Sequence, residues 1–231
     1  MHARLVSTKE LAPEIRHFVF EVPDVETLQF LPGQFVSLSH QIEGKPVTRA
    51  YSIASIPQGN QFELCLNRVR EGRFSPHLFE MSPGESISLK GLLGTFHWRK
   101  PVEKSVLVAT GTGIAPFRGM LLEELATDND SEITLVFGAR HPHGLLYRDE
   151  FEKLAAEHPR FRFWPTLTQP DEAWTGRAGR VQPHLLEALD GKIEGHVYIC
   201  GMKEMVDDVR VRLKEMGFDR KQIVTKNTID C

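Results

Sequence analysis

The chain has 231 residues, of which 41% are hydrophobic and 26% are charged, and its formal net charge at pH 7 is −3. These values are typical of globular proteins and allow one large domain or two small ones. The chain has no block of like charges and no basic tail, so we expect no nucleic-acid partner. The longest apolar runs are strand-sized, and the amino terminus has no secretory leader pattern, so we expect a cytoplasmic protein without membrane insertion.

The three cysteines, Cys65, Cys200 and Cys231, are scattered along the chain. Their odd number and the absence of a C-x-x-C spacing argue against a disulfide framework or a zinc site. An iron–sulfur cluster usually takes four thiolates, which is more than this chain supplies. Metal-ligand spacing is also lacking around the histidines, including His97, His141, His143 and His196. We therefore expect no metal site and a reducing compartment.

The first hundred residues alternate short apolar segments with turn signals such as Pro32-Gly33 and Pro83-Gly84. Many short strands with regular turns predict a closed antiparallel barrel or a sandwich. One short helix is expected near Ser75, with Ser75 as its N-cap and Pro76 in its first turn. The expected strands are Arg4–Ser7, His17–Val22, Gln34–Ser39, Arg49–Ala54, Gln61–Asn67 and Ser86–Leu89.

From about residue 104, buried strands alternate with helical segments, which predicts a parallel, doubly wound sheet. The charged, Pro-containing link Arg99–Lys104 marks the change between the two patterns. The expected strands are Val106–Thr110, Ile133–Gly138, Phe161–Leu167, His196–Cys200 and Gln222–Thr225, and the expected helices are Pro116–Ala126, Arg148–Glu157, Pro183–Leu189 and Met202–Met216. In the last helix, 3.6-residue periodicity places these residues on one face: Met202, Met205, Val206, Val209, Leu213 and Met216.

Two short motifs point to a specific chemistry. Gly111-Thr112-Gly113-Ile114-Ala115-Pro116 joins a buried strand to a helix, where backbone N–H groups and the helix end can approach a phosphate. Pro116 replaces the third glycine of the dinucleotide fingerprint, so an ordinary tight turn is an equal alternative on spacing alone. Arg49-Ala50-Tyr51-Ser52 places Arg49 and Tyr51 on one strand face, and taken alone it predicts only a half-buried strand.

In this order and spacing, the two motifs resemble the ferredoxin–NADP reductase family, and the resemblance covers nearly the whole chain. It implies an antiparallel flavin-binding β-barrel in residues 1–100, followed by a doubly wound nucleotide-binding α/β domain in residues 101–231. Further segments that carry the resemblance are Pro32–Phe35, Leu66–Val69, Gly72–Ser75, Gly91–Phe96, Leu146–Phe151 and Tyr198–Gly201.

On the flavin side, the resemblance implies that the Arg49 guanidinium faces the flavin phosphate. Tyr51 would lie against the isoalloxazine ring, and the catalytic Ser52 hydroxyl near flavin N5. The cofactor implied is FAD, with FMN the less favoured alternative. The other flavin contacts implied are Ala50, Asn67, Arg68, Val69, Gly72, Arg73, Phe74 and Ser75. A solvated surface is the equal alternative for Arg68, Arg70 and Arg73.

On the nucleotide side, the resemblance implies that residues 110–116 cradle the pyrophosphate: Thr110, Gly111, Thr112, Gly113, Ile114, Ala115 and Pro116. Cys200 and Gly201 would lie beside the nicotinamide, Cys200 as a catalytic group, although a small buried residue ending a strand is its alternative. NADPH-preferring members place a Ser-Arg pair where this chain has Thr168-Gln169-Pro170. NADH is therefore slightly favoured over NADPH, with Arg140 and Arg177 as residues that approach the ribose.

The carboxyl-terminal segment Asn227–Cys231 departs from the plant-type members, because it lacks the terminal aromatic residue that stacks on the flavin. Whether this segment covers the flavin is left open by the sequence.

The activity implied is hydride transfer between NADH or NADPH and bound FAD, followed by single-electron exchange with a separate carrier. The carrier would be a ferredoxin or flavodoxin, or a small-molecule acceptor. We hypothesise a basic docking rim for an acidic carrier, made of Lys45, Arg70, Arg73, Arg99 and Lys100. Two alternatives are an NAD(P)H:flavin reductase that uses diffusible flavin and a flavin-bearing redox-sensing or accessory subunit.

Overall fold

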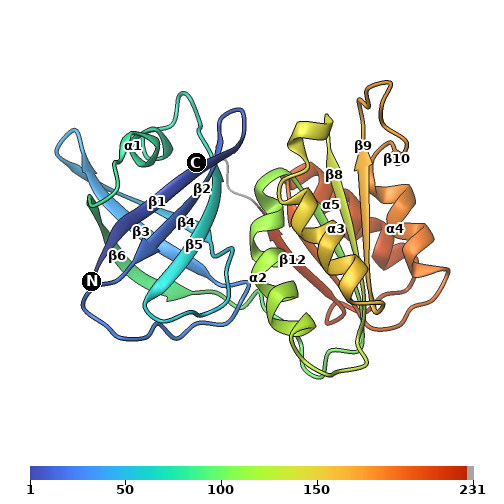
Figure 1. The fold of residues 1–231 in the computed structure, drawn as a ribbon. Helices are drawn as coiled ribbons and strands as arrows, with labels where there is room; N and C mark the ends of the chain where they lie inside the picture. Colours follow the sequence, from blue (N-terminus) through green and yellow to red (C-terminus); the bar gives the residue numbers. More distant parts are fainter. Residues whose placement is uncertain (228–231) are drawn as a thin grey trace. The chain divides into compact units, whose positions relative to one another are not determined.

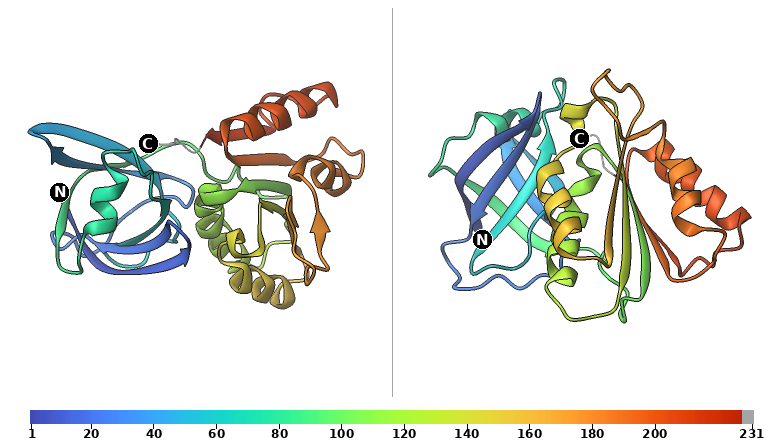
Figure 2. Two further views of the ribbon diagram at one scale, coloured as in Figure 1. Left: turned by 90° about the horizontal axis from the view of Figure 1, so that it is seen from above. Right: turned by 45° about the vertical axis from the view of Figure 1, so that its right-hand side comes forward.

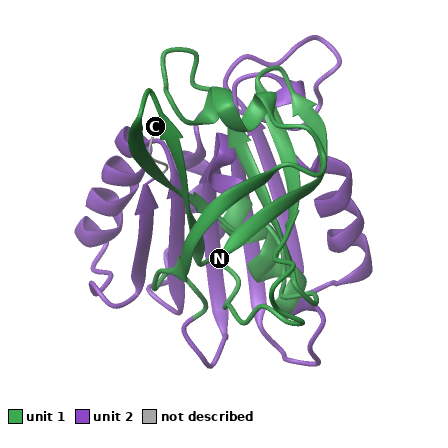
Figure 3. Ribbon diagram, turned by 90° about the vertical axis from the view of Figure 1, so that its left-hand side faces the viewer, with its two compact units in different colours: residues 1–98, 115–123, 229–231 green, residues 99–114, 124–228 purple. Residues whose placement is uncertain are grey.

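The structure is a computed structural model that describes residues 1–227, and its contacts divide the chain into two compact units (Figures 1 and 3). Among the described residues, the first unit contains 1–98 and 115–123, and the second contains 99–114 and 124–227. The chain thus passes between the units after Trp98, Ile114 and Glu123. Most of the helix that follows the glycine loop belongs by its contacts to the first unit.

The first unit contains a six-stranded antiparallel sheet in the order β4-β3-β6-β1-β2-β5. A bridge between Ile53 and Leu64 links the β4 and β5 ends of this order, which gives the sheet its barrel form. The strands are β1 (His2–Ala12), β2 (Ile15–Glu21), β3 (Phe35–Ile42), β4 (Lys45–Ser52), β5 (Gln61–Asn67) and β6 (Ser86–Leu93), and the helix is α1 (Ser75–Glu80). The predicted antiparallel barrel is confirmed.

Alternating apolar residues fill the interior of the barrel, as period-2 patterning requires. Phe20 and Phe62 are fully buried on the paired strands β2 and β5, with ring centroids 5.5 Å apart. Phe74 and Leu78 are also fully buried in this core, one just before α1 and one within it. Core packing therefore holds the loop before α1 against the barrel.

The second unit contains a six-stranded parallel sheet in the order β10-β9-β8-β7-β11-β12, so the predicted doubly wound sheet is confirmed. Its strands are β7 (Lys104–Thr110), β8 (Glu132–Ala139), β9 (Phe161–Leu167), β10 (Arg177–Ala178), β11 (His196–Gly201) and β12 (Ile223–Asn227). The helices of this half of the chain are α2 (Ile114–Leu125), α3 (Arg148–Glu157), α4 (Val181–Leu189) and α5 (Lys203–Glu215).

Helices α4 and α5 pack on one face of the parallel sheet, where their apolar residues join Val106, Val136 and Ile199 in one core cluster (Figure 2). On α5 the buried residues are Met205, Val206, Val209 and Leu213, as its periodicity predicts. Met202 is an exception, because it precedes the helix and its side chain is 55% exposed. Within residues 1–227, none of the helices combines the length and the apolar character that crossing a membrane requires.

Candidate flavin and nucleotide sites

The strand that carries the predicted flavin motif lies at the end of the barrel's strand order. β4 pairs with β3 along its whole length, from Ser52 opposite Phe35 to Lys45 opposite Ile42. Each residue from 49 to 52 is half-buried, whereas the core strands contain fully buried residues. A guanidinium, a phenol ring and a hydroxyl are thus presented together on an accessible strand. This set of groups fits a cofactor with an anionic phosphate and a flat ring.

Strand pairing confirms that Arg49 and Tyr51 share a face. They lie opposite Leu38 and Val36 of β3, both of which are fully buried. The Tyr51 ring packs beside Phe74, with centroids 6.0 Å apart and a tilt of 32° between the rings. Tyr51 thereby connects the β4 motif to the loop before α1, which is the second segment predicted to bind flavin.

That loop is held by its own hydrogen bonds. The Val69 N–H donates to Ser75 Oγ at 2.9 Å, and the Gly72 N–H donates to the Val69 carbonyl at 2.9 Å. The structure thus brings together two of the predicted flavin segments, 67–69 and 72–75. The expectation that Ser75 is the helix N-cap is wrong, because α1 begins at Ser75 and Phe74 occupies the cap position without a side-chain hydrogen bond. The buried Ser75 hydroxyl accepts from the loop instead, a known competition for Ser side chains.

The cations near this loop are exposed, and each lies within 4 Å of a carboxylate. The pairs are Arg68–Glu80 at 3.7 Å, Arg70–Glu14 at 3.6 Å and Arg73–Glu43 at 3.5 Å. Exposed pairs of this kind are weak and exchange readily for a better anion. The Arg70 and Arg73 contributions to the hypothetical docking rim are therefore partly neutralised. Of the other rim residues, Lys45 is exposed at the start of β4, and Arg99 and Lys100 belong to the second unit.

The glycine loop after β7 meets the end of β11 at very short range. A Cβ at Gly113 would overlap the Cys200 carbonyl oxygen and lie 2.7 Å from Gly201 Cα. A Cβ at Gly201 would overlap Thr110 Oγ1. At Gly113 any side chain would need the backbone to move, and at Gly201 the clash with the Thr110 side chain is joined by a φ of +156°, so both positions favour glycine. Residues 110–113 and 200–201, far apart in sequence, therefore form one structural unit.

This meeting point is the topological switch point of the sheet. β7 lies between β8, which follows it in the chain, and β11, which follows after two further strands. In open α/β sheets, ligands bind outside the carboxyl ends of the strands at this point. The Met202 N–H donates to Thr110 Oγ1 at 3.3 Å across the switch point. The predicted nucleotide residues thus flank the position at which such folds bind nucleotides.

Cys200 lies at this edge with its side chain fully buried, and burial raises the pKa of its thiol to about 12. The thiol is therefore neutral at physiological pH and is no nucleophile. Its neighbour in register on β12 is Lys226, whose pKa burial lowers to about 8. Sequence reasoning did not single out Lys226, and the mixed composition of β12 (Ile223–Asn227) gives no local signal for it.

The two arginines proposed to approach the ribose differ in their surroundings. Arg140 is exposed just after β8, and its carbonyl accepts from the Gln169 N–H at 2.8 Å. The Arg177 guanidinium lies 3.9 Å from the Trp164 ring centroid and donates two hydrogen bonds to the Glu187 carboxylate, one of them at 2.8 Å. Arg177 is thus engaged within the protein, and the guanidinium lowers the pKa of Glu187.

The segment 227–231, considered as a flavin cover, lies outside the described residues apart from Asn227.

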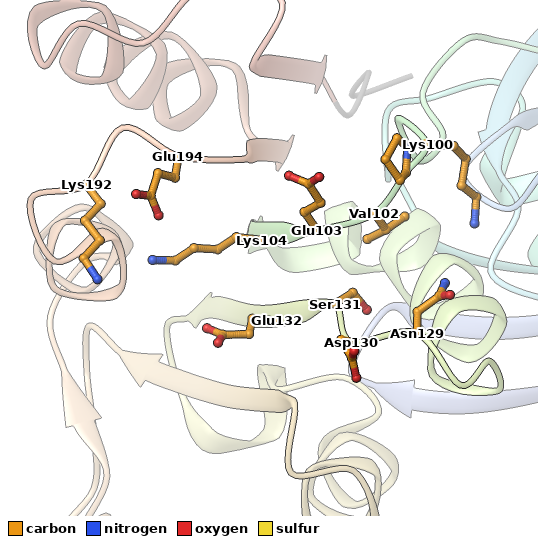
Figure 4. Close-up of a pocket in the computed structure, with 11 residues that line it drawn as sticks. Lys100, Val102, Glu103, Lys104, Asn129, Asp130, Ser131, Glu132, Lys192 and Glu194 are labelled. Carbon is orange, nitrogen blue, oxygen red and sulfur yellow. The ribbon is translucent and has the colours of Figure 1, made fainter.

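A cavity of about 680 Å³ lies at the amino-terminal ends of β7 and β8, on the edge of the sheet opposite to the switch point (Figure 4). Its lining carries both signs of charge, including Lys104, Lys192, Glu132 and Glu194. Lys100, a residue of the hypothetical rim, lines it and donates to the buried Glu124 carboxylate at 3.1 Å. None of the residues predicted to bind flavin or nucleotide lines this cavity.

Comparison with known proteins decides the family. The oxidoreductase FAD-binding domain family matches residues 2–98, and the oxidoreductase NAD-binding domain family matches residues 107–211. A ferredoxin–NADP reductase B from Sorangium cellulosum is 38% identical over 231 residues, which cover 96% of this chain and 94% of the relative. The chain belongs to the ferredoxin–NADP reductase family. It is therefore an FAD- and NAD(P)-binding oxidoreductase, as the motifs imply.

Other members of the ferredoxin–NADP reductase family show its range. An NADH-cytochrome b5 reductase 1 from Dictyostelium discoideum is 32% identical, over 91% of this chain and 76% of the relative. The solved structure of a ferredoxin NADP⁺ reductase from Neisseria gonorrhoeae with bound FAD and NADP has a TM-score of 0.84 at 26% identity. That comparison covers 99% of this chain and 98% of the other.

Proposed function

We propose that this family member transfers hydride between NADH or NADPH and bound FAD, and then exchanges single electrons with a separate carrier of the ferredoxin or flavodoxin type. The observation that supports this most is the meeting of residues 110–113 with 200–201 at the switch point, where two positions favour glycine. The relative named as a ferredoxin–NADP reductase, matched over 94% of its length, supports this choice of carrier.

In the first unit, the proposed flavin contacts follow from accessible groups. Arg49 holds the flavin phosphate through charge-assisted hydrogen bonds, and the Tyr51 ring provides a flat surface beside it. The Ser52 hydroxyl serves as a hydrogen-bond partner near the reacting edge of the flavin. Residues 67–69 and 72–75 complete the site through the loop that the Val69–Ser75 bond closes. Bound FAD supplies the redox chemistry, since it accepts an electron pair and passes electrons singly.

In the second unit, the proposed nucleotide contacts are mainly backbone groups. The N–H groups of residues 110–116 and the amino-terminal end of α2 hold the pyrophosphate. Cys200 supports the nicotinamide site from within the protein as a small, neutral group, because its side chain is fully buried and its thiol stays protonated. Its contribution is thus to position the backbone at the end of β11.

For the choice of nucleotide, we propose a preference for NADH. Thr168-Gln169-Pro170 supplies no cation after β9, and Arg177 is engaged by Glu187 and Trp164. Arg140 remains as the accessible cation of the two arginines proposed to approach the ribose.

Anaerobic visible spectra of the purified protein, titrated separately with NADH and NADPH and then mixed with an oxidised ferredoxin or flavodoxin, test the proposal. We expect a yellow protein that NADH bleaches faster than NADPH, and whose colour returns when the carrier is added. A yellow protein that neither nucleotide bleaches would favour the accessory subunit. A colourless protein that reduces added riboflavin would favour the diffusible-flavin reductase, and one that cannot be reconstituted with FAD or FMN would remove the β4 assignment.

A further inference from the structure

Arg118 lies one turn into α2 and connects this helix to the flavin half of the chain. Its Nη1 donates to the Ala54 carbonyl at 2.8 Å and to the Glu63 carboxylate. Ala54 follows the β4 motif by two residues, and Glu63 belongs to β5. All three residues belong to the first unit, which includes residues 115–123 of α2 (Figure 3). Arg118 therefore joins α2 to the segment that continues the predicted flavin-binding strand.

The segment that Arg118 contacts is itself held to β5. The Ala54 N–H donates to the Glu63 carbonyl at 2.8 Å, and the Glu63 N–H donates to Ser55 Oγ at 3.1 Å. Ala54 and Ser55 are both buried. The residues that follow Ser52 thus have a defined position in the barrel.

The next residue of α2 approaches the same segment at backbone distance. A Cβ added at Gly119 would lie 2.5 Å from the Ser55 carbonyl oxygen, so the helix could not lie this close with a side chain there. At a further point, Trp98 Nε1 donates to the Met120 carbonyl at 2.9 Å. Side-chain and backbone contacts together hold α2 against the barrel.

The Glu63 carboxylate is shared between α2 and the barrel. It accepts from Arg118 and lies 3.6 Å from His17 Nε2 of β2. The side chains of Arg118 and Glu63 are 15% and 27% exposed. Charge-assisted hydrogen bonds are short and directional, and a partly buried pair is screened little by salt. This link therefore defines the position of α2 more closely than an exposed ion pair would.

We propose that Arg118 is a positioning residue for hydride transfer, which holds the amino-terminal end of α2 at a fixed distance from the strand that carries Ser52. The inference rests on the proposed function, in which that end of α2 binds the pyrophosphate of the nucleotide and β4 binds the flavin. Arg118 acts through Ala54 and Glu63 and binds neither cofactor. Transfer requires the reacting atoms to be about 3–3.5 Å apart, and a displacement of about 1 Å can lower the rate about a hundredfold. Loss of the link should therefore slow hydride transfer without weakening binding.

Anaerobic stopped-flow reduction of the FAD-loaded protein, with the nucleotide that reduces the wild type faster, tests this inference. Varying the nucleotide concentration separates the limiting rate of flavin reduction from the apparent Kd, and nucleotide deuterated at both C4 positions shows whether hydride transfer sets that rate. The variants are Arg118→Met, which removes the donors and keeps an unbranched stem, and Arg118→Lys, which keeps the charge. Arg212→Met is the matched control, because it removes an equal charge and a hydrogen bond to Asp208 from the exposed surface of α5.

We expect Arg118→Met to lower the limiting rate about ten- to a hundredfold, with an apparent Kd within about threefold of the wild type and an unchanged FAD content. Arg118→Lys should recover part of the rate, because its ammonium still donates to Glu63, and both variants should show a deuterium isotope effect. Arg212→Met should be reduced at the wild-type rate. Gly119→Ala, which pushes α2 away from Ser55 and keeps both members of the ion pair, should give the same pattern as Arg118→Met.

An unchanged limiting rate in Arg118→Met, or a slower rate without an isotope effect, would overturn the inference. A loss of FAD, or a rise in Kd that accounts for the slower reduction, would also overturn it, because Arg118 would then serve binding. A wild-type protein that neither nucleotide reduces would instead overturn the proposed function, and this inference with it. If Arg118→Met fails to fold, Gly119→Ala decides: a wild-type limiting rate in that variant would overturn the inference.

Discussion

The candidate flavin site of the first unit and the candidate nucleotide site of the second unit are built in different ways. On β4, the predicted flavin contacts are side chains on a half-exposed strand, and the charged groups nearby form only weak pairs. At the switch point, the predicted nucleotide contacts are backbone segments so close that glycine is favoured at Gly113 and Gly201. The flavin site therefore depends on the side chains that β4 presents, whereas the nucleotide site depends on two positions that have no side chain. Different substitutions should therefore weaken FAD binding and nucleotide binding.

The largest effect is expected from adding one methyl group at Gly113. Gly113 has an ordinary φ of −61°, but its Cβ would overlap the Cys200 carbonyl, so Gly113→Ala must displace backbone. We expect at least about a hundredfold loss of nucleotide affinity, which corresponds to about 3 kcal/mol. The change is measured by nucleotide titration of the FAD-loaded protein.

Gly191→Ala is the matched control for this clash. Gly191 lies outside the predicted sites, has a φ of +69°, and has nothing within 4 Å of its added Cβ. The substitution therefore carries only the cost of a left-handed alanine, about 1–2 kcal/mol in unfolding free energy. If both variants bound nucleotide equally well, the close approach at Gly113 would not matter for the site.

The next largest effect is expected from removing the Arg49 guanidinium. Arg49→Ala should weaken FAD binding about ten- to a hundredfold, because a charge-assisted hydrogen bond to phosphate is worth about 1.5–3 kcal/mol. Flavin retained after gel filtration measures the effect. Arg70→Ala removes an equal charge from an exposed residue paired with Glu14, and it should retain FAD as the wild type does. Wild-type occupancy in Arg49→Ala would remove Arg49 from the site.

A smaller effect is expected from salt on the reaction with an acidic carrier. Because Arg70 and Arg73 are each near a carboxylate, the rim should give only about a three- to tenfold fall in the bimolecular rate between low and physiological ionic strength. Stopped-flow kinetics with a ferredoxin or flavodoxin measure the slope. A rate independent of salt would exclude the basic rim as a docking surface.

The smallest effect is expected at Cys200. With a pKa of about 12, its thiol should resist alkylation by iodoacetamide at about pH 8, where a model cysteine is partly ionised. Mass spectrometry of the labelled peptides identifies the modified residue. Rapid labelling of Cys200 in the native protein would show that the thiol is neither buried nor neutral.

Much of the fold could be predicted from local patterns. The bounds of β5, β9 and α3 match the residues expected from alternation and helical periodicity. β10 has two residues and is formed by pairing with β9, so it has no periodicity of its own to detect. Met202 follows the apolar period of α5 but occupies its N-cap with a non-helical ψ of 140°, and its N–H donates to Thr110 Oγ1.

The residues of the candidate sites could be proposed from the sequence where a motif specifies them. Their contacts with residues distant in sequence could not. The strand that carries Arg49 and Tyr51 has the expected alternation. The role of the Ser75 hydroxyl depends on the fold of the preceding loop, which capping preferences do not describe. Arg177 donates to Glu187, and Cys200 is in register with Lys226 of the neighbouring strand. Both interactions depend on the tertiary fold, so no local sequence pattern predicts them.

The central claim is that FAD binding and nucleotide binding depend on different residues in the two units. The visible spectrum of Gly113→Ala, recorded before and after anaerobic addition of the nucleotide that reduces the wild type, tests this claim most directly. We predict a yellow protein with wild-type FAD content whose flavin is not bleached at nucleotide concentrations that fully bleach the wild type. A variant that loses its FAD, or one that is bleached as readily as the wild type, would contradict the claim that the two sites depend on different residues.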